Sequence, residues 1–270
     1  MKRIGTVSLI GGGPGDPELL TVKALRRIEQ AEAVVYDRLI SKDILDLVPP
    51  RTALYPVGKT PRNHPVPQHE INQMLVDLAR SGLRVVRLKG GDPFIFGRGS
   101  EEALALVEAE VPFEIVPGIT AAQGCASQLG VPLTHRGLAT GVRYVTGHCR
   151  EDKPLDLDWK SLADPDTTLV VYMGLSAIGQ ISHQLIAHGL DSETPVMAVS
   201  RGTTPDECHV TGTLATIAEQ AKAAALPSPT LFMIGEVTRL GNILHPERLK
   251  DCAEVEASSR RPARLEVVHG

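Results

Sequence analysis

The sequence is poor in aromatic residues and has no large excess of charge of either sign. Only 3% of its 270 residues are aromatic, and the formal net charge is -4. A general nucleic-acid binder usually carries a basic excess, so we expect no nucleic-acid partner. With 42% hydrophobic and 22% charged residues, the chain is also too apolar and too evenly charged for a disordered protein.

Long apolar runs are missing as well. No stretch approaches the roughly 18 consecutive apolar residues that a membrane helix needs. Met1, Lys2 and Arg3 lead directly into a short β-rich run, without the apolar segment of a signal peptide. We therefore expect a cytoplasmic protein that binds no membrane.

The sequence also lacks the spacings of common metal sites. Its four cysteines form no CxxC and fit no zinc or iron–sulfur signature. The nine histidines include no HExxH, and His183 and His188 would lie on different faces of a helix. We expect no metal site.

What the chain does contain is a regular alternation of strand and helix patterns. In the first half, the patterns predict strands over 4–10, 33–36, 53–57, 84–88 and 113–116, and helices over 22–30, 44–48, 67–80, 101–108 and 120–129. In the second half, they predict strands over 143–146, 168–172, 196–200, 208–212 and 230–234, and helices over 177–187 and 214–222. Alternation of this kind is typical of a mostly parallel sheet covered by helices.

The predicted fold class is therefore α/β, with two domains. An N-terminal α/β domain is expected over residues 1–117, a connecting helix and linker over 118–140, and a C-terminal α/β domain over 141–245. Residues 246–270 are polar, and we expect them to form a loosely held tail.

Two glycine-rich loops directly follow predicted strands, at residues 11–17 (GGGPGDP) and 90–99 (GGDPFIFGRG). Open α/β sheets bind ligands at the carboxyl ends of their strands, and glycine permits close approach of the backbone. A dinucleotide site is disfavoured because the third glycine of the first loop falls at the wrong spacing. Pro14 and Pro17 also remove backbone donors from that loop. The loops suit a nucleoside without phosphates.

Two windows of the chain contain basic residues and no acid, between Asp46 and Glu70 and between Glu114 and Glu151. Glycine and proline are frequent in them, which places them in loops, where binding residues tend to lie. Their basic residues are Arg51, Lys59, Arg62, His64, His69, His135, Arg136, Arg143, His148 and Arg150. Arginine binds carboxylates bidentately, so the windows predict a surface for a polyanion. A chance gap with solvated arginines is the alternative.

The motifs in their order resemble the tetrapyrrole methylase family. The similar segments are GGGPGDP (11–17), VYDRL (35–39), VGK (57–59), VVRLKGGDPFIFGRG (85–99), VPGITAA (116–122), PLTHR (132–136), VTGH (145–148) and YMG (172–174). The similarity runs from about residue 4 to residue 240. The first loop reads GGGPGD where the family more often has GAGPGD, a small departure.

The resemblance implies two α/β domains with S-adenosylmethionine in a cleft between them, and a homodimer. The implied reaction transfers two methyl groups to carbons C2 and C7 of uroporphyrinogen III. Its products are precorrin-2, used in sirohaem and cobalamin biosynthesis, and S-adenosylhomocysteine. The cofactor positions implied in this chain are Pro14, Gly90, Gly91, Asp92, Ile95, Thr120, Ala121, Met173 and Gly202.

The same resemblance implies acid and base roles for Asp37 and Lys59. A carboxylate such as Asp37 can stabilise the positive charge that develops on the macrocycle or accept its proton. Lys59 can equally anchor a substrate carboxylate. Uroporphyrinogen carries eight carboxylates, and we expect it to be held by Arg38, Arg98, His135 and Arg136. Glu101 is expected to orient Arg98 or to act as a base.

Three other functions stay open at this point. A related enzyme could methylate another ring position, or a substrate such as a modified histidine, but the complete GGDPFIFGRG and PLTHR runs favour uroporphyrinogen III. A nucleoside-binding regulator would bind the cofactor without turnover, and Asp37, Arg98 and Arg136 argue against it. An oxidoreductase that uses NAD is disfavoured by the glycine spacing.

Overall fold

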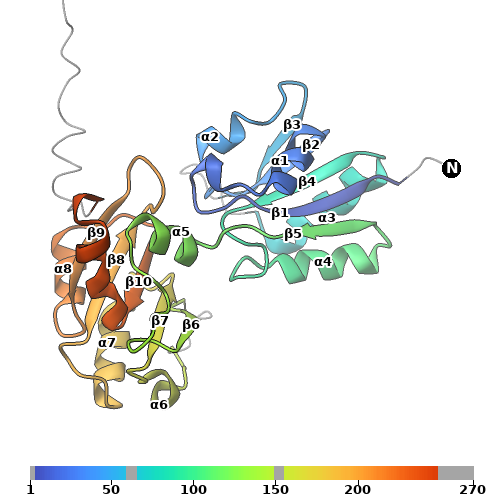
Figure 1. The fold of residues 1–270 in the computed structure, drawn as a ribbon. Coiled ribbons are helices and arrows are strands. Elements are labelled where there is room, and N and C mark those ends of the chain that lie inside the picture. Colours follow the sequence, from blue (N-terminus) through green and yellow to red (C-terminus); the bar gives the residue numbers. More distant parts are fainter. Residues whose placement is uncertain (1–3, 59–65, 149–154, 249–270) are drawn as a thin grey trace, which may run out of the picture. The chain divides into compact units, whose positions relative to one another are not determined.

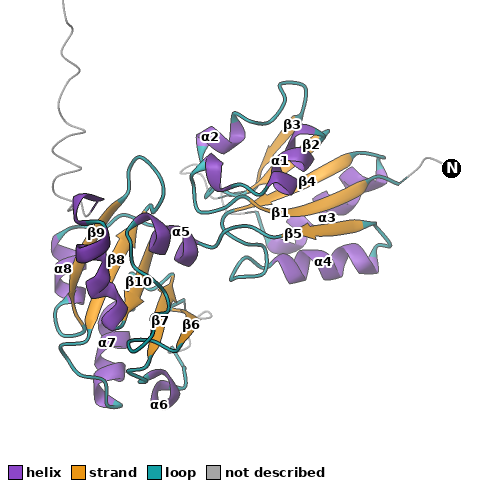
Figure 2. Ribbon diagram, in the orientation of Figure 1, coloured by secondary structure: helices purple, strands orange, loops and turns teal. Residues whose placement is uncertain are grey.

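The chain forms two structural units. The computed structural model describes residues 4–58, 66–148 and 155–248. The chain divides into the units Met1–Gly124 and Cys125–Gly270 (Figure 1). Within the described residues, each unit contains one five-stranded sheet with helices packed against it (Figure 2). The predicted α/β class is confirmed.

The first unit is built on a fully parallel sheet. Its strands are β1 (Thr6–Gly11), β2 (Ala33–Tyr36), β3 (Ala53–Pro56), β4 (Arg84–Lys89) and β5 (Phe113–Val116), in the order β3-β2-β4-β1-β5. The helices are α1 (Val22–Glu29), α2 (Lys42–Leu45), α3 (Gln68–Arg80) and α4 (Gly99–Glu108), with a 3-10 turn at Pro17–Leu19. All five carboxyl ends therefore lie at one edge of the sheet.

Helices cover both faces of this sheet. Val7 and Val85 face one way and pack with residues of α3 and α4, whereas Val34 and Val86 face the other way and pack with residues of α1 and α2. Successive side chains of a strand point to opposite faces, so a strand covered on both sides is mostly apolar. That is why the inner strands β1, β2 and β4 are largely buried, whereas the edge strand β3 is mostly exposed.

The second unit has a mixed sheet. Its strands are β6 (Gly141–Thr146), β7 (Thr167–Tyr172), β8 (Pro195–Ser200), β9 (Cys208–Thr213) and β10 (Thr230–Ile234), in the order β6-β7-β10-β8-β9. Only β6 and β7 pair in parallel, and the other neighbours are antiparallel. The expectation of a mostly parallel sheet is therefore wrong for this unit. The loop between β8 and β9 is too short for a crossover helix, so these strands form a hairpin.

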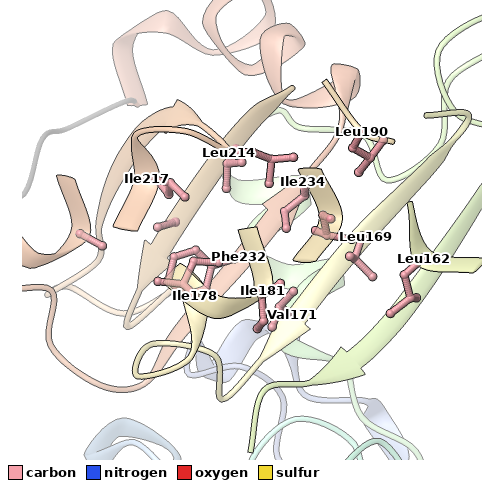
Figure 3. Packing of buried hydrophobic residues seen from close by; sticks show 14 of the residues in the cluster. Leu162, Leu169, Val171, Ile178, Ile181, Leu190, Leu214, Ile217, Phe232 and Ile234 are labelled. Atoms are coloured by element: carbon pink, nitrogen blue, oxygen red, sulfur yellow. The ribbon is translucent and has the colours of Figure 1, made fainter. Parts of the chain in front are cut away.

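The helices of the second unit are α5 (Ala121–Gln128), in which the division between the units falls, α6 (Trp159–Leu162), α7 (Ile178–Ala187), α8 (Ile217–Ala223) and α9 (Gly241–Leu244). Among these, α6, α7 and α8 contribute residues to the main hydrophobic core. Ile178 and Ile181 of α7 pack beside Val171 and Phe232 of the sheet (Figure 3). All four side chains are at most 3% exposed.

Short elements account for most differences from the sequence prediction. The helices α6 and α9 and the 3-10 turns Glu236–Leu240 and Pro246–Arg248 were not predicted, because three to five residues show no periodic pattern. The helix expected over 44–48 begins earlier, because Ser41 Oγ caps it by accepting from the Ile44 amide at 3.4 Å. Most of the predicted tail lies outside the described residues.

Glu114 of β5 is the centre of an ion cluster on the α1 side of the sheet. Its carboxylate accepts hydrogen bonds from Arg27 and from Ser8 Oγ (3.0 Å), and Lys23 Nζ lies 2.8 Å away. These contacts, first of all the hydrogen bond from Arg27, lower the pKa of Glu114 from 4.5 to about 2. A carboxyl group whose pKa is lower in the folded than in the unfolded protein stabilises the fold at pH values above its unfolded pKa. This stabilisation is lost as the pH falls through the folded pKa.

We expect Glu114→Gln to destabilise the protein in a pH-dependent way. At pH 7 the free energy of unfolding should fall by about 1 kcal/mol. The effect is this small because solvent screens the charges of the partly exposed cluster. The difference from wild type should shrink between pH 4.5 and pH 2, where the wild-type carboxylate becomes protonated. Urea denaturation at pH 7, 4 and 2.5 measures it, with the exposed Asp46→Asn as control. A difference that stays constant down to pH 2 would contradict the assignment.

Candidate active site

Three loops meet at the carboxyl edge of the first sheet. The loop after β1 is joined to the loop after β4, because the Gly13 amide donates to Gly91 O at 3.2 Å and the Gly91 amide donates to Gly13 O at 2.7 Å. The loop after β5 lies against both. A Cβ placed on Gly118 would stand 2.2 Å from Gly91 O, and one on Gly11 would stand 2.5 Å from Gly118 N. Glycine is required at these positions because the backbones touch.

Asp92 and Thr120 hold these loops in place. Asp92 Oδ1 accepts from the Phe94 amide at 2.8 Å, and Oδ2 accepts from the Gly118 amide at 3.1 Å. Thr120 is buried at the start of α5 and accepts from the Gln123 amide at 3.2 Å. Both residues are predicted cofactor positions. The structure gives each a part in the loop framework that a ligand would contact.

The structure brings six of the predicted cofactor positions together here. A Cβ on Gly91 would stand 3.9 Å from the Ala121 amide nitrogen and 4.0 Å from Thr120 Cα. The six positions, all on the three joined loops, are Pro14, Gly90, Gly91, Asp92, Thr120 and Ala121. Ile95 follows in the loop after β4, where its amide donates to Asp92 O at 3.3 Å. Such a glycine-lined edge fits a nucleoside that approaches the backbone closely.

Asp37 lies at the same edge, at the carboxyl end of β2, beside a buried group of charges. Arg87 and Lys89 of β4 are 1% and 3% exposed, and Glu102 of α4 is 0% exposed. Arg87 Nη2 donates to Asp37 Oδ1 at 2.6 Å and Arg87 Nε donates to Glu102 Oε1 at 2.9 Å. Lys89 Nζ donates to Glu102 Oε1 at 3.0 Å and lies 3.7 Å from Asp37 Oδ2. We call these four residues the charge network.

The network changes the proton affinity of its two cations in opposite directions. Burial lowers the pKa of Lys89, and the neighbouring Arg87 charge lowers it further. Burial also opposes the charge on Arg87, but Asp37 and Glu102 outweigh it and raise the pKa of Arg87. Only Asp37 of the network was predicted. The available signal was the pair of basic residues at alternate positions of an otherwise apolar strand, which places both on one buried face.

Arg38, Arg98 and Glu101, also predicted in this unit, lie on its surface. Arg98 and Glu101 form a bidentate ion pair, with Nε to Oε1 at 2.9 Å and Nη2 to Oε2 at 2.7 Å. This geometry has Glu101 orienting Arg98, one of the two roles expected for it. Arg38 is exposed, and its backbone packs against Gly58. Lys59 lies outside the described residues.

In the second unit, Met173 and Gly202 lie at one edge of the sheet. Met173 follows β7 and Gly202 lies just after β8, and both strands run antiparallel to β10, which lies between them. Gly202 has no room for a side chain, because a Cβ would stand 2.2 Å from the Sγ of buried Cys125. His135 and Arg136 lie elsewhere in this unit, in a turn closed by the His135 amide donating to Ala139 O at 3.1 Å.

Backbone strain is concentrated in the predicted ligand loops. Among the described residues, seven that are not glycine have a positive φ. Five of them lie after β4, β7 and β8: Phe96, Arg98, Met173, Arg201 and Thr203. A positive φ is unfavourable for a residue that carries a Cβ. Residues that adopt it nevertheless cluster at functional sites. The strain therefore supports the same two strand edges as ligand-binding regions.

Comparison with known proteins agrees with this geometry. A family model described as Tetrapyrrole (Corrin/Porphyrin) Methylases matches residues 6–218. The chain belongs to the tetrapyrrole methylase family. The chain is 51% identical over 267 residues to the uroporphyrinogen-III C-methyltransferase of Paracoccus denitrificans, covering 99% of this chain and 90% of that one. The family resemblance stated from the motifs is confirmed.

Other family members extend the comparison. The siroheme synthase of Hahella chejuensis is 53% identical over 240 residues, which are 89% of this chain but 51% of the synthase. The chain therefore spans about half the length of that relative. A solved structure of Thermus thermophilus uroporphyrin-III C-methyl transferase complexed with S-adenyl homocysteine is 42% identical, with a TM-score of 0.74. It covers 87% of this chain and 94% of the Thermus chain.

Within the described ranges, none of the helices has the length and apolarity to cross a membrane. No group of three or more histidine, cysteine, aspartate or glutamate side chains in that part of the chain is arranged to hold a metal ion.

The contact between the three loops makes Gly118 a position that is sensitive to substitution. We expect Gly118→Ala to destabilise the protein by about 1–3 kcal/mol, because its methyl group would overlap Gly91 O. Affinity for S-adenosylhomocysteine should fall as well, since the loops must separate. Thermal denaturation and calorimetric titration measure the two effects. Gly179→Ala is the control. Gly179 lies in α7, and a Cβ placed on it would stand 3.7 Å from the Cβ of Ala218, an ordinary contact distance. An unchanged affinity in Gly118→Ala would argue against a ligand site at these loops.

Proposed function

We propose that the protein transfers two methyl groups from S-adenosylmethionine to carbons C2 and C7 of uroporphyrinogen III, giving precorrin-2 and S-adenosylhomocysteine. The observation that carries the proposal is the 51% identity over 99% of the chain to the uroporphyrinogen-III C-methyltransferase of Paracoccus denitrificans. The identity to a siroheme synthase supports a step in sirohaem biosynthesis. Precorrin-2 equally serves cobalamin biosynthesis.

For the cofactor, we propose the glycine-lined edge of the first unit and the strained edge of the second. S-adenosylmethionine supplies a methyl group already activated by its sulfonium charge. The protein then has to orient the methyl group and the ring carbon, and needs no nucleophile of its own. The proposed binding residues are Pro14, Gly90, Gly91, Asp92, Ile95, Thr120, Ala121, Met173 and Gly202. The Thermus thermophilus structure complexed with S-adenyl homocysteine supports a ligand of this type.

Asp37 is the proposed acceptor of the proton. The new bond joins a ring carbon to the methyl carbon, the sulfur keeps the electron pair of the broken bond, and positive charge develops on the macrocycle. Loss of one proton from the macrocycle neutralises that charge. Asp37 suits this role because its side chain is 30% exposed and the contact with Arg87, 2.6 Å away, holds its carboxylate in place. Lys59 and Glu101 are the other proposed acid or base groups.

The substrate carboxylates are proposed to bind the basic side chains of both units. These are Arg38 and Arg98 of the first unit and His135 and Arg136 of the second. Each is exposed, as a contact with a large polyanion requires. We further propose that the protein is a cytoplasmic homodimer without nucleic-acid or membrane partners, and light scattering on the purified protein tests the dimer.

We expect Arg136→Ala to raise the KM for uroporphyrinogen III by about tenfold to a hundredfold, because one charge-assisted contact to a carboxylate is lost. Affinity for S-adenosylhomocysteine should stay unchanged. Steady-state kinetics and calorimetric titration test this, with the exposed Arg239→Ala as control. A loss of cofactor affinity would assign Arg136 to the other site.

The proposed reaction is tested with purified protein, S-adenosylmethionine and enzymatically prepared uroporphyrinogen III without oxygen. The expected result is a mass gain of two methyl groups and the absorbance of the methylated product. Methylation at another ring position, identified by NMR, would indicate a related enzyme with a different substrate. Binding of S-adenosylhomocysteine without any turnover would indicate a regulator and overturn the proposal.

A further inference from the structure

The charge network is organised around Glu102, which lies too deep to be a surface ion pair. Its Oε1 accepts from Arg87 Nε (2.9 Å), Lys89 Nζ (3.0 Å) and Gln68 Nε2 (3.2 Å). Its Oε2 is buried and has no hydrogen-bond partner among the described residues. Beyond Glu102, the two cations both extend to the carboxylate of Asp37. Glu102 and Asp37 therefore share the same pair of cations from opposite sides.

Stability does not explain this arrangement. Buried ion pairs are weak contributors to stability, because removing charges from water offsets most of their attraction. On the same face of the sheet, Val85 of β4 and Val35 of β2 are apolar and well packed. Apolar residues in place of the whole network would pack in the same way. The charges of this face lie in the carboxyl half of β4 and just after β2, which points to a function at Asp37.

We propose that Glu102 and Lys89 are positioning residues that set the orientation and the basicity of the Asp37 carboxylate. The proposal rests on the proposed function of Asp37 as proton acceptor. The buried Glu102 anion compensates the charges of Arg87 and Lys89 beside Asp37. Because Glu102 also fixes both cationic side chains, it fixes the direction in which Asp37 points.

The charges around Asp37 predict the direction in which each substitution should shift its pKa. Among the described residues, the charged groups facing its carboxylate are Arg87 and Lys89 from β4, with Glu102 of α4 behind them. The neighbouring α3 contributes the neutral amide of Gln68, and the loop after β3 continues into residues 59–65, outside the described part. Loss of the Lys89 charge should raise the pKa of Asp37, and loss of the Glu102 charge should lower it.

The test compares Lys89→Met, Glu102→Gln and the double variant, with Glu114→Gln as a control on the opposite face of the sheet. In Lys89→Met, the acid limb of the kcat profile should move up by about one pH unit. In Glu102→Gln, it should move down by a similar amount, and in the double variant it should return close to wild type. In both single variants kcat should fall by about tenfold to a hundredfold at unchanged KM, because Asp37 is misplaced.

A second measurement does not depend on turnover. The carboxyl carbon of Asp37, labelled with ¹³C and assigned by its loss in Asp37→Asn, reports its pKa directly in each variant. Opposite shifts in Lys89→Met and Glu102→Gln support the proposal even if wild-type protein methylates nothing, which would overturn only the proposed function. Active protein whose variants show equal or no shifts overturns the positioning proposal and leaves the function intact. If Glu102→Gln does not fold, the test uses position 89 alone. The pKa of Asp37 should then rise in Lys89→Met and return close to the wild-type value in Lys89→Arg, and the absence of a difference between these two variants would overturn the proposal.

Discussion

Replacing Asp37 by asparagine is expected to lower kcat about a hundredfold to ten-thousandfold, the range over which a positioned acid or base acts. Asparagine keeps the size and one acceptor oxygen of the side chain but does not take up a proton at neutral pH. It also stabilises positive charge on the macrocycle less well than a carboxylate. Both proposed uses of Asp37 predict a loss in the chemical step.

The affinity for S-adenosylhomocysteine and the thermal stability of Asp37→Asn decide how that loss is interpreted. The affinity should stay within a factor of about two to three, since Asp37 is outside the three glycine-lined loops. Single-turnover kinetics separates chemistry from product release, and Asp46→Asn on the exposed end of α2 is the matched control. A large drop in cofactor affinity would place Asp37 in the cofactor site. An unchanged rate of methyl transfer would remove it from catalysis.

Replacing Arg87 by leucine is expected to destabilise the protein by about 3–5 kcal/mol, the usual effect of removing one partner of a buried ion pair. Arg87 is 1% exposed and hydrogen-bonds Asp37 and Glu102, so its loss leaves Glu102 buried with only Lys89 to compensate it. Catalysis should fall with it, because Asp37 loses its 2.6 Å contact. The effect on stability should exceed that of any exposed ion pair.

Arg84 in the same strand supplies the matched control. Its side chain is 59% exposed and lies 3.5 Å from Glu32, so Arg84→Leu should change stability by about 0–1 kcal/mol. Urea denaturation at pH 7 measures both variants. Adding Glu102→Leu to Arg87→Leu should recover part of the loss, because the uncompensated charge is removed. If Arg87→Leu and Arg84→Leu lose equal stability, the charge network does not behave as a buried one.

The parallel sheet of the first unit was predictable because its strands are covered on both faces. The predicted strand and helix patterns correspond to β1–β5 and α1–α4, and the predicted ranges 33–36 and 113–116 coincide with β2 and β5. The glycine runs marked the loops after β1 and β4 for a related reason. Gly11 stands where the backbones touch and leaves no room for a Cβ, and Gly91 has a positive φ that favours glycine.

Apart from Asp37, the charge network was not predicted, although Arg87 and Lys89 lie within the segment 85–99 that carried the family resemblance. The letters RLK of β4 place two cations on one face of the strand. Their partners, Asp37 and Glu102, come from β2 and α4, and only the folded sheet brings all four together. A sequence pattern shows that a buried strand carries charge, but the identity of the compensating groups depends on contacts between distant segments.

The second sheet shows the same limit at the level of topology. Its strands were expected where β6–β10 lie, but β10 inserts between β7 and β8 and makes most of the sheet antiparallel. Local patterns report which residues are extended and buried. They do not report which strand becomes the neighbour of which, since that depends on how the whole unit packs.

The sequence by itself therefore determined the α/β class, the glycine-rich loops and the family, and the family resemblance implied the residues, such as Asp37, that are proposed to carry the chemistry. These follow from local properties: the period of apolar residues, the backbone freedom of glycine and the spacing of motifs. Only the tertiary structure decided the strand order of the second unit, the closing of three loops around Gly91 and Gly118, and the link from Asp37 through Arg87 and Lys89 to Glu102. Each of these is a contact between segments far apart in the chain, and such contacts exist only once the core has packed.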